Sequence, residues 1–246
     1  LAQDYAGGLS VVLVDDGSDD GTADQARRAA AGDDRLVVVS GAALRDGWTG
    51  KLWAQAQGVE TAAAVRPDAT YLLLCDADIE HGLDALGRLV ARAEAEHLDL
   101  VSLMVKLHCE TRWERLLIPA FVFFFQQLYP FPRVNDPARA DAAAAGGCML
   151  VRREALERIG GIKAIRDRII DDCALAAAIK QGGPIWLGLA ERSRSLRPYA
   201  GLGEIWAMVA RTAFIQLNRS ALLVAAAALA MVVIYLAPPA ALLAGV

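Results

Sequence analysis

The stretch Tyr71-Leu72-Leu73-Leu74-Cys75-Asp76-Ala77-Asp78 decides the fold, because an apolar run stops abruptly at two acidic residues. Such a run is typical of a strand buried on both faces of a parallel sheet. Ligands of open parallel sheets bind just beyond the carboxyl ends of the strands. Asp76 and Asp78 therefore lie where a ligand is expected, and a cation between them relieves their repulsion. Mg²⁺ and Mn²⁺ prefer such oxygen ligands, although a polar loop that begins with two acids has the same sequence.

A second predicted strand, residues 9–14, ends in a similar acidic turn, Asp15-Asp16-Gly17-Ser18-Asp19-Asp20-Gly21-Thr22. A carboxylate at a strand end can accept hydrogen bonds from a ribose or from a base N–H, and the glycines permit a tight turn. The glycines are too few for a dinucleotide fingerprint. A turn capped by Asp and Ser has the same composition. Two strands of one sheet that both end in acid pairs favour a nucleotide site over an ordinary turn.

Strand and helix patterns alternate along the chain. Strands are predicted at residues 9–14, 36–39, 71–75, 98–105 and 148–151, and helices at residues 22–31 (with Thr22 as N-cap), 53–64, 83–96 and 153–159. This βαβα order predicts an α/β fold with a mostly parallel, doubly wound sheet flanked by helices.

The composition narrows the class of protein. A chain of 246 residues is long enough for one large α/β domain. A net charge of −4 and the lack of a basic stretch argue against nucleic acid as a partner. The 4 cysteines form no CxxC pair and only 3 histidines occur, which argues against a zinc site or a disulfide framework. No basic region followed by an apolar core opens the chain, so no signal peptide is expected.

A hydrophobic fraction of 55% is high for a soluble domain, and the C-terminal segment accounts for much of it. Residues 221–237 are continuously apolar and would rise about 25 Å as a helix, near the lower limit for a bilayer span. A buried core helix is the alternative, but the segment has no polar face. We expect a transmembrane helix bounded by Pro238-Pro239, with a second span cut off at Val246. Arg211 and Arg219 on its N-terminal side place the preceding domain in the cytoplasm.

The second apolar segment is residues 112–133, with the run Leu116–Phe125 at its centre. Arginines, tryptophan and prolines flank this run. It is too short to span a bilayer, but its aromatic and arginine edges suit a helix that lies in the membrane interface. A core helix is the alternative. Four phenylalanines within five residues would then need an unusually roomy core.

Four motifs in the same order resemble family 2 glycosyltransferases of the GT-A fold. They are VVLVDDGSDDGT (11–22), DAD (76–78), GGCMLVRREALERIGG (146–161) and IIDDCALA (169–176). The stretches GWTGKLWA (47–54) and MVARTAFIQL (208–217), together with IIDDCALA, resemble the hopene-associated subfamily more narrowly. The resemblance covers nearly the whole chain. It implies a GT-A domain over residues 1–215, followed by a truncated transmembrane part over residues 216–246.

The resemblance also implies roles for individual residues. Asp15 or Asp16 would hold the uracil or ribose of a nucleotide sugar, with UDP-sugar the expected donor, and Asp76 and Asp78 would place a divalent cation, Mg²⁺ or Mn²⁺, on its diphosphate. Lys51 would face the same nucleotide, unless it is a solvated lysine. Either Asp171 or Asp172 would be the general base, although both also suit the first turn of a helix. Arg211 matches the arginine of the family's Arg-Trp motif, but Thr212 follows it here.

Relatives begin with a strand that ends in a Pro-x-x-Asn-Glu type motif, and this sequence starts after that point. The domain is therefore expected to lack its first strand. The expected function is an inverting glycosyltransferase that moves a sugar to the hydroxyl of a lipid such as a hopanoid or a sphingolipid-like alcohol. Its expected location is a bacterial inner membrane, with the catalytic domain in the cytoplasm. The alternatives are a processive polysaccharide synthase and a non-catalytic, membrane-anchored relative.

Overall fold

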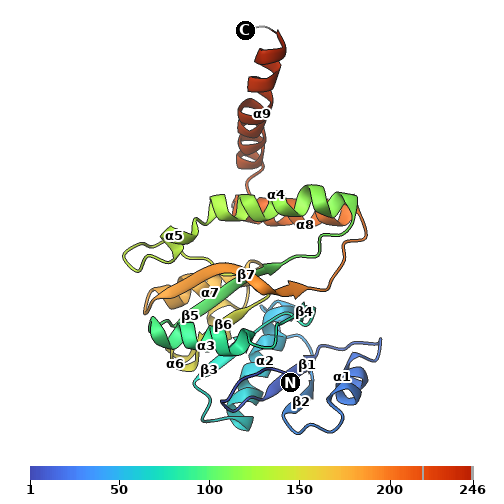
Figure 1. Ribbon diagram of the computed structural model, residues 1–246, viewed down its shortest axis with the longest axis vertical. Helices are drawn as coiled ribbons and strands as arrows, with labels where there is room; N and C mark the ends of the chain where they lie inside the picture. Colours follow the sequence, from blue (N-terminus) through green and yellow to red (C-terminus); the bar gives the residue numbers. More distant parts are fainter. Residues whose placement is uncertain (218, 245–246) are drawn as a thin grey trace.

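The computed structural model describes residues 1–217 and 219–244. The strands in this part of the chain are β1 (Val11–Asp15), β2 (Leu36–Ser40), β3 (Tyr71–Leu74), β4 (Ile79–Glu80), β5 (Leu100–Lys106), β6 (Met149–Arg152) and β7 (Ile185–Ser195). The helices are α1 (Thr22–Ala30), α2 (Gly50–Val65), α3 (Ala85–Ala95), α4 (Arg112–Leu128), α5 (Phe131–Val134), α6 (Arg153–Arg158), the 3₁₀ turn η1 (Ile162–Ile165), α7 (Asp171–Lys180), α8 (Leu202–Gln216) and α9 (Ala221–Ala244). Figure 1 shows the sheet region, a layer formed by α4 and α8, and α9 rising from that layer.

The core lies on both faces of the central strands, because successive side chains of a strand point to opposite faces. Leu100 and Met149 contribute to one cluster together with buried residues of α2, α6 and α7. Val101 and Leu150, their neighbours in sequence, contribute to the other cluster with buried residues of α3. Strands β5 and β6 are therefore covered on both sides, as the apolar runs in the sequence predict.

The prediction of one mostly parallel sheet is wrong in its topology. Strands β1 and β2 form a separate two-stranded parallel sheet, and the other strands form a sheet in the order β3-β6-β5-β7-β4. Within this second sheet only β5 and β7 are parallel, and β6 is antiparallel to both of its neighbours. The reason is the position of β6, which enters between β3 and β5 from the edge where β5 ends. Sequence order alone does not place such a late strand in the middle of a sheet.

Helix α2 covers both β1 and β3, although these two strands belong to different sheets. A Cβ atom on Gly58 of α2 would lie 3.3 Å from a methyl group of Val14 in β1. Val59 of the same helix packs in the cluster that contains Leu72 of β3. Helix α2 thus connects the two sheets, and its first turn lies at the ends of both strands.

The start of α2 and the capping residue of α1 differ from the sequence prediction. Helix α2 begins at Gly50 instead of residue 53, because the Thr49 hydroxyl accepts a hydrogen bond from the Leu52 N–H at 3.4 Å and so caps the helix. Helix α1 begins at Thr22, with Gly21 in the capping position at φ 78°, so the prediction of Thr22 as N-cap is wrong by one residue. The earlier start of α2 matters for function, since it places Lys51 in the first helical turn.

Residues 112–133 form α4 and α5, and α4 lies beside α8 (Figure 1). Ile118 of α4 is buried, whereas several large apolar side chains of both helices are exposed: Trp113, Leu116, Phe123, Phe124 and Leu128 of α4, and Leu202, Trp206 and Phe214 of α8. A helix with this much exposed apolar surface is not an ordinary core helix. Its position in a membrane interface stays a prediction.

Buried Glu114 fixes the start of α4. Its carboxylate accepts hydrogen bonds from the backbone N–H groups of Glu110, Thr111 and Tyr199 at 2.8–3.0 Å, and it lies 2.9 Å from His108 Nδ1. The backbone donors hold the pKa of this carboxyl group far below its ordinary value. Because Tyr199 belongs to the segment between β7 and α8, Glu114 ties together the starts of the two exposed helices.

The C-terminal segment forms a single helix, α9, with none of its apolar window buried. It is the one helix in the described residues that is long and apolar enough to cross a membrane. The expected boundary at Pro238-Pro239 is wrong, because α9 continues through both prolines to Ala244. Each proline removes one N–H donor, and apolar helices tolerate this loss. The predicted end at Val246 lies outside the described residues.

The burial of Leu52 gives a stability prediction. Its side chain is fully buried beneath the first turn of α2, so Leu52→Ala should lower the free energy of unfolding by about 2–5 kcal/mol. The control is Leu44→Ala in the preceding loop, where the side chain is 58% exposed and the expected loss is within about 0.5 kcal/mol. Urea unfolding of the purified protein, followed by circular dichroism, compares the two. Equal losses would contradict the described packing of α2.

Candidate functional site

The acidic groups predicted from the sequence lie at the ends of three elements. Asp15 ends β1, Asp76 lies two residues after the end of β3, and Asp171 begins α7. The first turn of α2 connects these places. A Cβ atom on Gly50 would lie 3.5 Å from Oδ2 of Asp16, and the next residue, Lys51, contacts the other two acidic groups.

Lys51 lies between carboxylates of two different elements. Its ammonium nitrogen is 3.0 Å from Oδ1 of Asp76 and 3.1 Å from Oδ2 of Asp171. Partial burial works against the charge of Lys51, but the carboxylates of Asp171 and Asp76 outweigh this effect and raise its pKa. We call Lys51, Asp76, Asp171 and Asp172 the Lys51 cluster.

Asp172 is held in a different way from Asp171. Its Oδ2 accepts a hydrogen bond from the Gly146 N–H at 2.9 Å, and its Oδ1 accepts one from the Cys173 N–H at 2.7 Å. Burial and the neighbouring charge of Asp171 raise the pKa of Asp172, although both N–H donors and Lys51 offset part of the change. This carboxyl group is therefore fixed in orientation and is more basic than an ordinary aspartate.

Gly146 and Tyr129 belong to the same site, and the sequence analysis did not identify either as a functional residue. A side chain at Gly146 would come within 3.0 Å of the Lys51 nitrogen, so glycine leaves room for the ammonium group. Burial raises the pKa of Tyr129, and the nearby Cys173 and Asp172 raise it further. Tyr129 directly follows α4 and packs against the same core cluster as Cys173, the neighbour of Asp172. In the sequence, the Gly146-Gly147 pair before β6 was the one signal that the backbone there lies close to another group.

Asp78 lies in other surroundings than Asp76. Its Oδ2 accepts a hydrogen bond from the Ser195 hydroxyl at 2.6 Å, and its carbonyl oxygen accepts one from the Leu196 N–H at 2.8 Å. The end of β7 therefore holds Asp78, while Asp76 turns toward Lys51. Ser195 was not predicted from the sequence, because its contact with Asp78 joins residues more than one hundred positions apart.

The carboxylates of Asp76, in the Lys51 cluster, and of Asp78 offer the oxygen ligands that a divalent cation prefers. Within residues 1–217 and 219–244, no three His, Cys, Asp or Glu side chains are already arranged around one metal position. Oδ2 of Asp171 is buried, and the ammonium of Lys51, 3.1 Å away, is its counter-charge. The ionised carboxylates of Asp76 and Asp171 are stabilised by the nearby positive charge of Lys51. Such carboxylate oxygens are suitable ligands for Mg²⁺ or Mn²⁺.

Asp15 and Asp16 differ in how far they face the site. Oδ1 of Asp15 accepts a hydrogen bond from the Ser18 N–H at 3.1 Å and so closes the turn after β1. Asp16 is exposed and lies near the first turn of α2. Of this predicted pair, Asp16 is therefore the carboxylate available to a ligand.

Arg211 is not brought into the Lys51 cluster. It is exposed on α8, and no ion pair in the described part of the chain joins it to an acidic residue of the cluster. Helix α8 runs beside α4 in the outer layer (Figure 1). The contacts of Arg211 in the structure therefore do not support its predicted role at the diphosphate.

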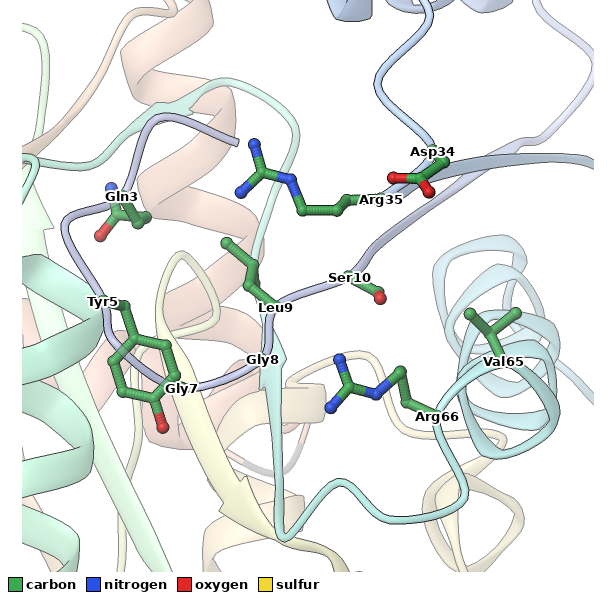
Figure 2. A pocket seen from close by; sticks show the side chains of 10 residues that line it. All are labelled: Gln3, Tyr5, Gly7, Gly8, Leu9, Ser10, Asp34, Arg35, Val65 and Arg66. Carbon is green, nitrogen blue, oxygen red and sulfur yellow. The ribbon is translucent and has the colours of Figure 1, made fainter.

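An open cavity of about 400 Å³ lies at the other end of α2 from Lys51. Figure 2 shows its lining, with the side chains of Arg35 and Arg66 on either side of the segment around Leu9. Both guanidinium groups are already paired, Arg35 with Asp33 and Arg66 with Asp68. Since ligands of such sheets bind at the carboxyl ends of strands, this cavity at the amino end of β1 is not the candidate active site.

Comparison with known proteins identifies the fold. The chain is similar to the mannosyltransferase PcManGT from Pyrobaculum calidifontis in complex with GDP-Man and Mn²⁺, with a TM-score of 0.53 and 24% identity, over 85% of this chain and 57% of that chain. It is also similar to S. aureus TarS 1-349 in complex with UDP, with a TM-score of 0.51 and 15% identity, over 79% of this chain and 53% of that chain. The chain thus spans little more than half the length of these solved structures.

A search of curated proteins found no significant match. The sequence profile described as Glycosyl transferase family 2 matches residues 1–160, which include β1 to β6 and the acidic turns after β1 and β3. The mixed sheet, the flanking helices and the similar solved structures agree with this match. The chain therefore belongs to glycosyl transferase family 2 and has the GT-A glycosyltransferase fold.

Proposed function

We propose that this chain is the catalytic part of a membrane-associated, inverting glycosyltransferase that moves a sugar from a nucleotide-sugar donor to a lipid hydroxyl. The observation that carries the proposal is the Lys51 cluster. Carboxylates from β3 and α7 meet there at one ammonium group, 3.0 and 3.1 Å away. Sugar transfer requires a site that binds the diphosphate with its cation and a carboxylate that acts as a base. This arrangement provides both.

The donor would bind across the ends of β1 and β3. Asp16, with Asp15 behind it, would accept hydrogen bonds from the ribose or the base, and Lys51 would face the diphosphate. Asp76 and Asp78 would hold Mg²⁺ or Mn²⁺, which supplies positive charge to the leaving diphosphate. The similar structures with GDP-Man and Mn²⁺ and with UDP support a nucleotide-sugar donor and a divalent cation. A UDP-sugar remains the donor that we propose.

Asp172 is the better candidate for the general base. Asp171 is neutralised by Lys51, whereas two N–H donors orient Asp172 and burial raises its pKa. Asp172 would take the proton of the acceptor hydroxyl while the oxygen of that hydroxyl attacks the anomeric carbon of the sugar. The bond from that carbon to the diphosphate breaks, and the nucleoside diphosphate leaves with the electron pair. One displacement inverts the configuration at the anomeric carbon.

The acceptor would come from the membrane. Helix α9 is apolar and unburied, and the exposed side chains of α4 and α8 include Phe123, 51% exposed, and Trp206, 71% exposed. Amphipathic helices of this kind lie in the interface between headgroups and acyl chains. Tyr129, directly after α4, packs against the same core cluster as Cys173, the neighbour of Asp172. The resemblance to the hopene-associated subfamily favours a polycyclic or sphingolipid-like alcohol, at the cytoplasmic face of a bacterial inner membrane.

The metal site gives the second prediction. Asp76→Ala and Asp78→Ala should each abolish Mn²⁺-dependent binding of a nucleotide sugar, because each removes a proposed ligand of the cation. The control is Asp68→Ala, which removes an exposed carboxylate at the far end of α2. Isothermal titration calorimetry with UDP-glucose or GDP-mannose, with and without Mn²⁺, measures the effect. Retained metal-dependent binding in both variants would exclude this site.

The third prediction concerns the base. Asp172→Asn should lower the turnover number for sugar transfer by about 10²–10⁴-fold, because the amide cannot take the proton, and donor binding should remain. The control is Asp167→Asn, an exposed aspartate shortly before α7. Transfer of radiolabelled sugar to extracted membrane lipids measures both variants. Full transfer by Asp172→Asn would place the base elsewhere, and a product that lengthens with time would favour a polysaccharide synthase.

The fourth prediction concerns the outer helices. In lipid nanodiscs, brominated acyl chains should quench the fluorescence of Trp113 and Trp206, because both lie exposed on α4 and α8. The double variant Trp113→Phe/Trp206→Phe should lose most of this quenching. Trp48→Phe/Trp53→Phe should keep it, since those rings pack together near the start of α2. The opposite pattern would show that α4 and α8 do not contact the bilayer.

A further inference from the structure

Lys51 lies at the start of a helix, a position that disfavours a positive charge. It is the second residue of α2, and the first turn of a helix presents unpaired N–H groups with a partial positive charge. The ammonium group is therefore not stabilised by its own helix. It is stabilised by Asp76 and Asp171, at 3.0 and 3.1 Å.

The surroundings are shaped around the ammonium group. Gly146 has no side chain, and a Cβ atom there would lie 3.0 Å from the Lys51 nitrogen. Oδ2 of Asp171 is buried, and the Lys51 ammonium group, 3.1 Å away, is its counter-charge. The side chain of Asp76 is 40% exposed, in contrast to 13% for Asp171. A second cation arriving from solvent would therefore meet Asp76 first.

A divalent cation at Asp76 would place two further positive charges close to the ammonium of Lys51. Like charges this close repel strongly in a partly buried site. The repulsion is relieved if Lys51 leaves Asp76 and turns toward a negative group that arrives with the cation. The diphosphate of a nucleotide sugar is such a group.

We propose that Lys51 is the resident counter-cation of the cluster and competes with the divalent cation for Asp76. Metal uptake is then tight only when a diphosphate is present to receive the ammonium group. This inference rests on the proposed function, since it takes Asp76 as a metal ligand. It adds a coupling between metal and donor: the free protein keeps the metal out, and the donor brings it in.

The test is Mn²⁺ binding, measured on the full chain in detergent by the electron paramagnetic resonance signal of free Mn²⁺. Without nucleotide, Lys51→Met should bind Mn²⁺ about tenfold more tightly than the unchanged protein, because the competing charge is gone. Addition of UDP or GDP should tighten Mn²⁺ binding strongly in the unchanged protein and much less in Lys51→Met. The control is Lys163→Met, which removes an exposed lysine of η1 and should change neither affinity.

Three further variants keep the outcome decisive. Lys51→Arg should retain the weak Mn²⁺ binding, because it retains the charge. If circular dichroism shows that Lys51→Met is unfolded, Lys51→Gln replaces it. Unchanged or weaker Mn²⁺ binding in the neutral variants would overturn the proposal. If Asp76→Ala still abolishes Mn²⁺ binding in that case, the metal site stands and only the competition fails. If Asp76→Ala has no effect, both the metal site and the competition are wrong.

Discussion

The rest of the site depends on the contact of Lys51 with Asp76 and Asp171. This contact joins the end of a strand to the start of a helix almost one hundred residues later. The cap at Thr49 starts α2 early enough to bring Lys51 there, and Gly146 leaves the room that its ammonium needs. Without one positive charge at this point, the carboxylates would repel each other.

The same arrangement links the chemistry to the outer layer of the molecule. Asp172 is next to Asp171 in α7, and Tyr129, which follows α4, packs against the same core cluster as the neighbouring Cys173. Glu114, at the start of α4, fixes that helix to the segment that leads into α8. The exposed apolar helices and the candidate base are thus parts of one connected structure.

Local signals in the sequence predicted five of the strands, β1, β2, β3, β5 and β6, but they did not predict β4 or the long strand β7. The apolar runs of β1 and β3 and the acids after them predicted that Asp15, Asp16 and Asp76 lie at strand ends. The antiparallel entry of β6 was not predictable, because a strand pattern carries no information on its partner. Ser195 contacts Asp78, a residue far away in the sequence, so no short motif indicates its role. The prolines in α9 were given too much weight as a helix boundary.

The position of Mn²⁺ in crystals grown with UDP tests the central claim most directly. Anomalous diffraction at the manganese edge locates the ion without any assumption about the reaction. We expect a peak within coordination distance of Asp76, with the UDP diphosphate beside it and the Lys51 ammonium group moved away from Asp76. A manganese peak elsewhere, for example beside the cavity of Arg35 and Arg66, would contradict it.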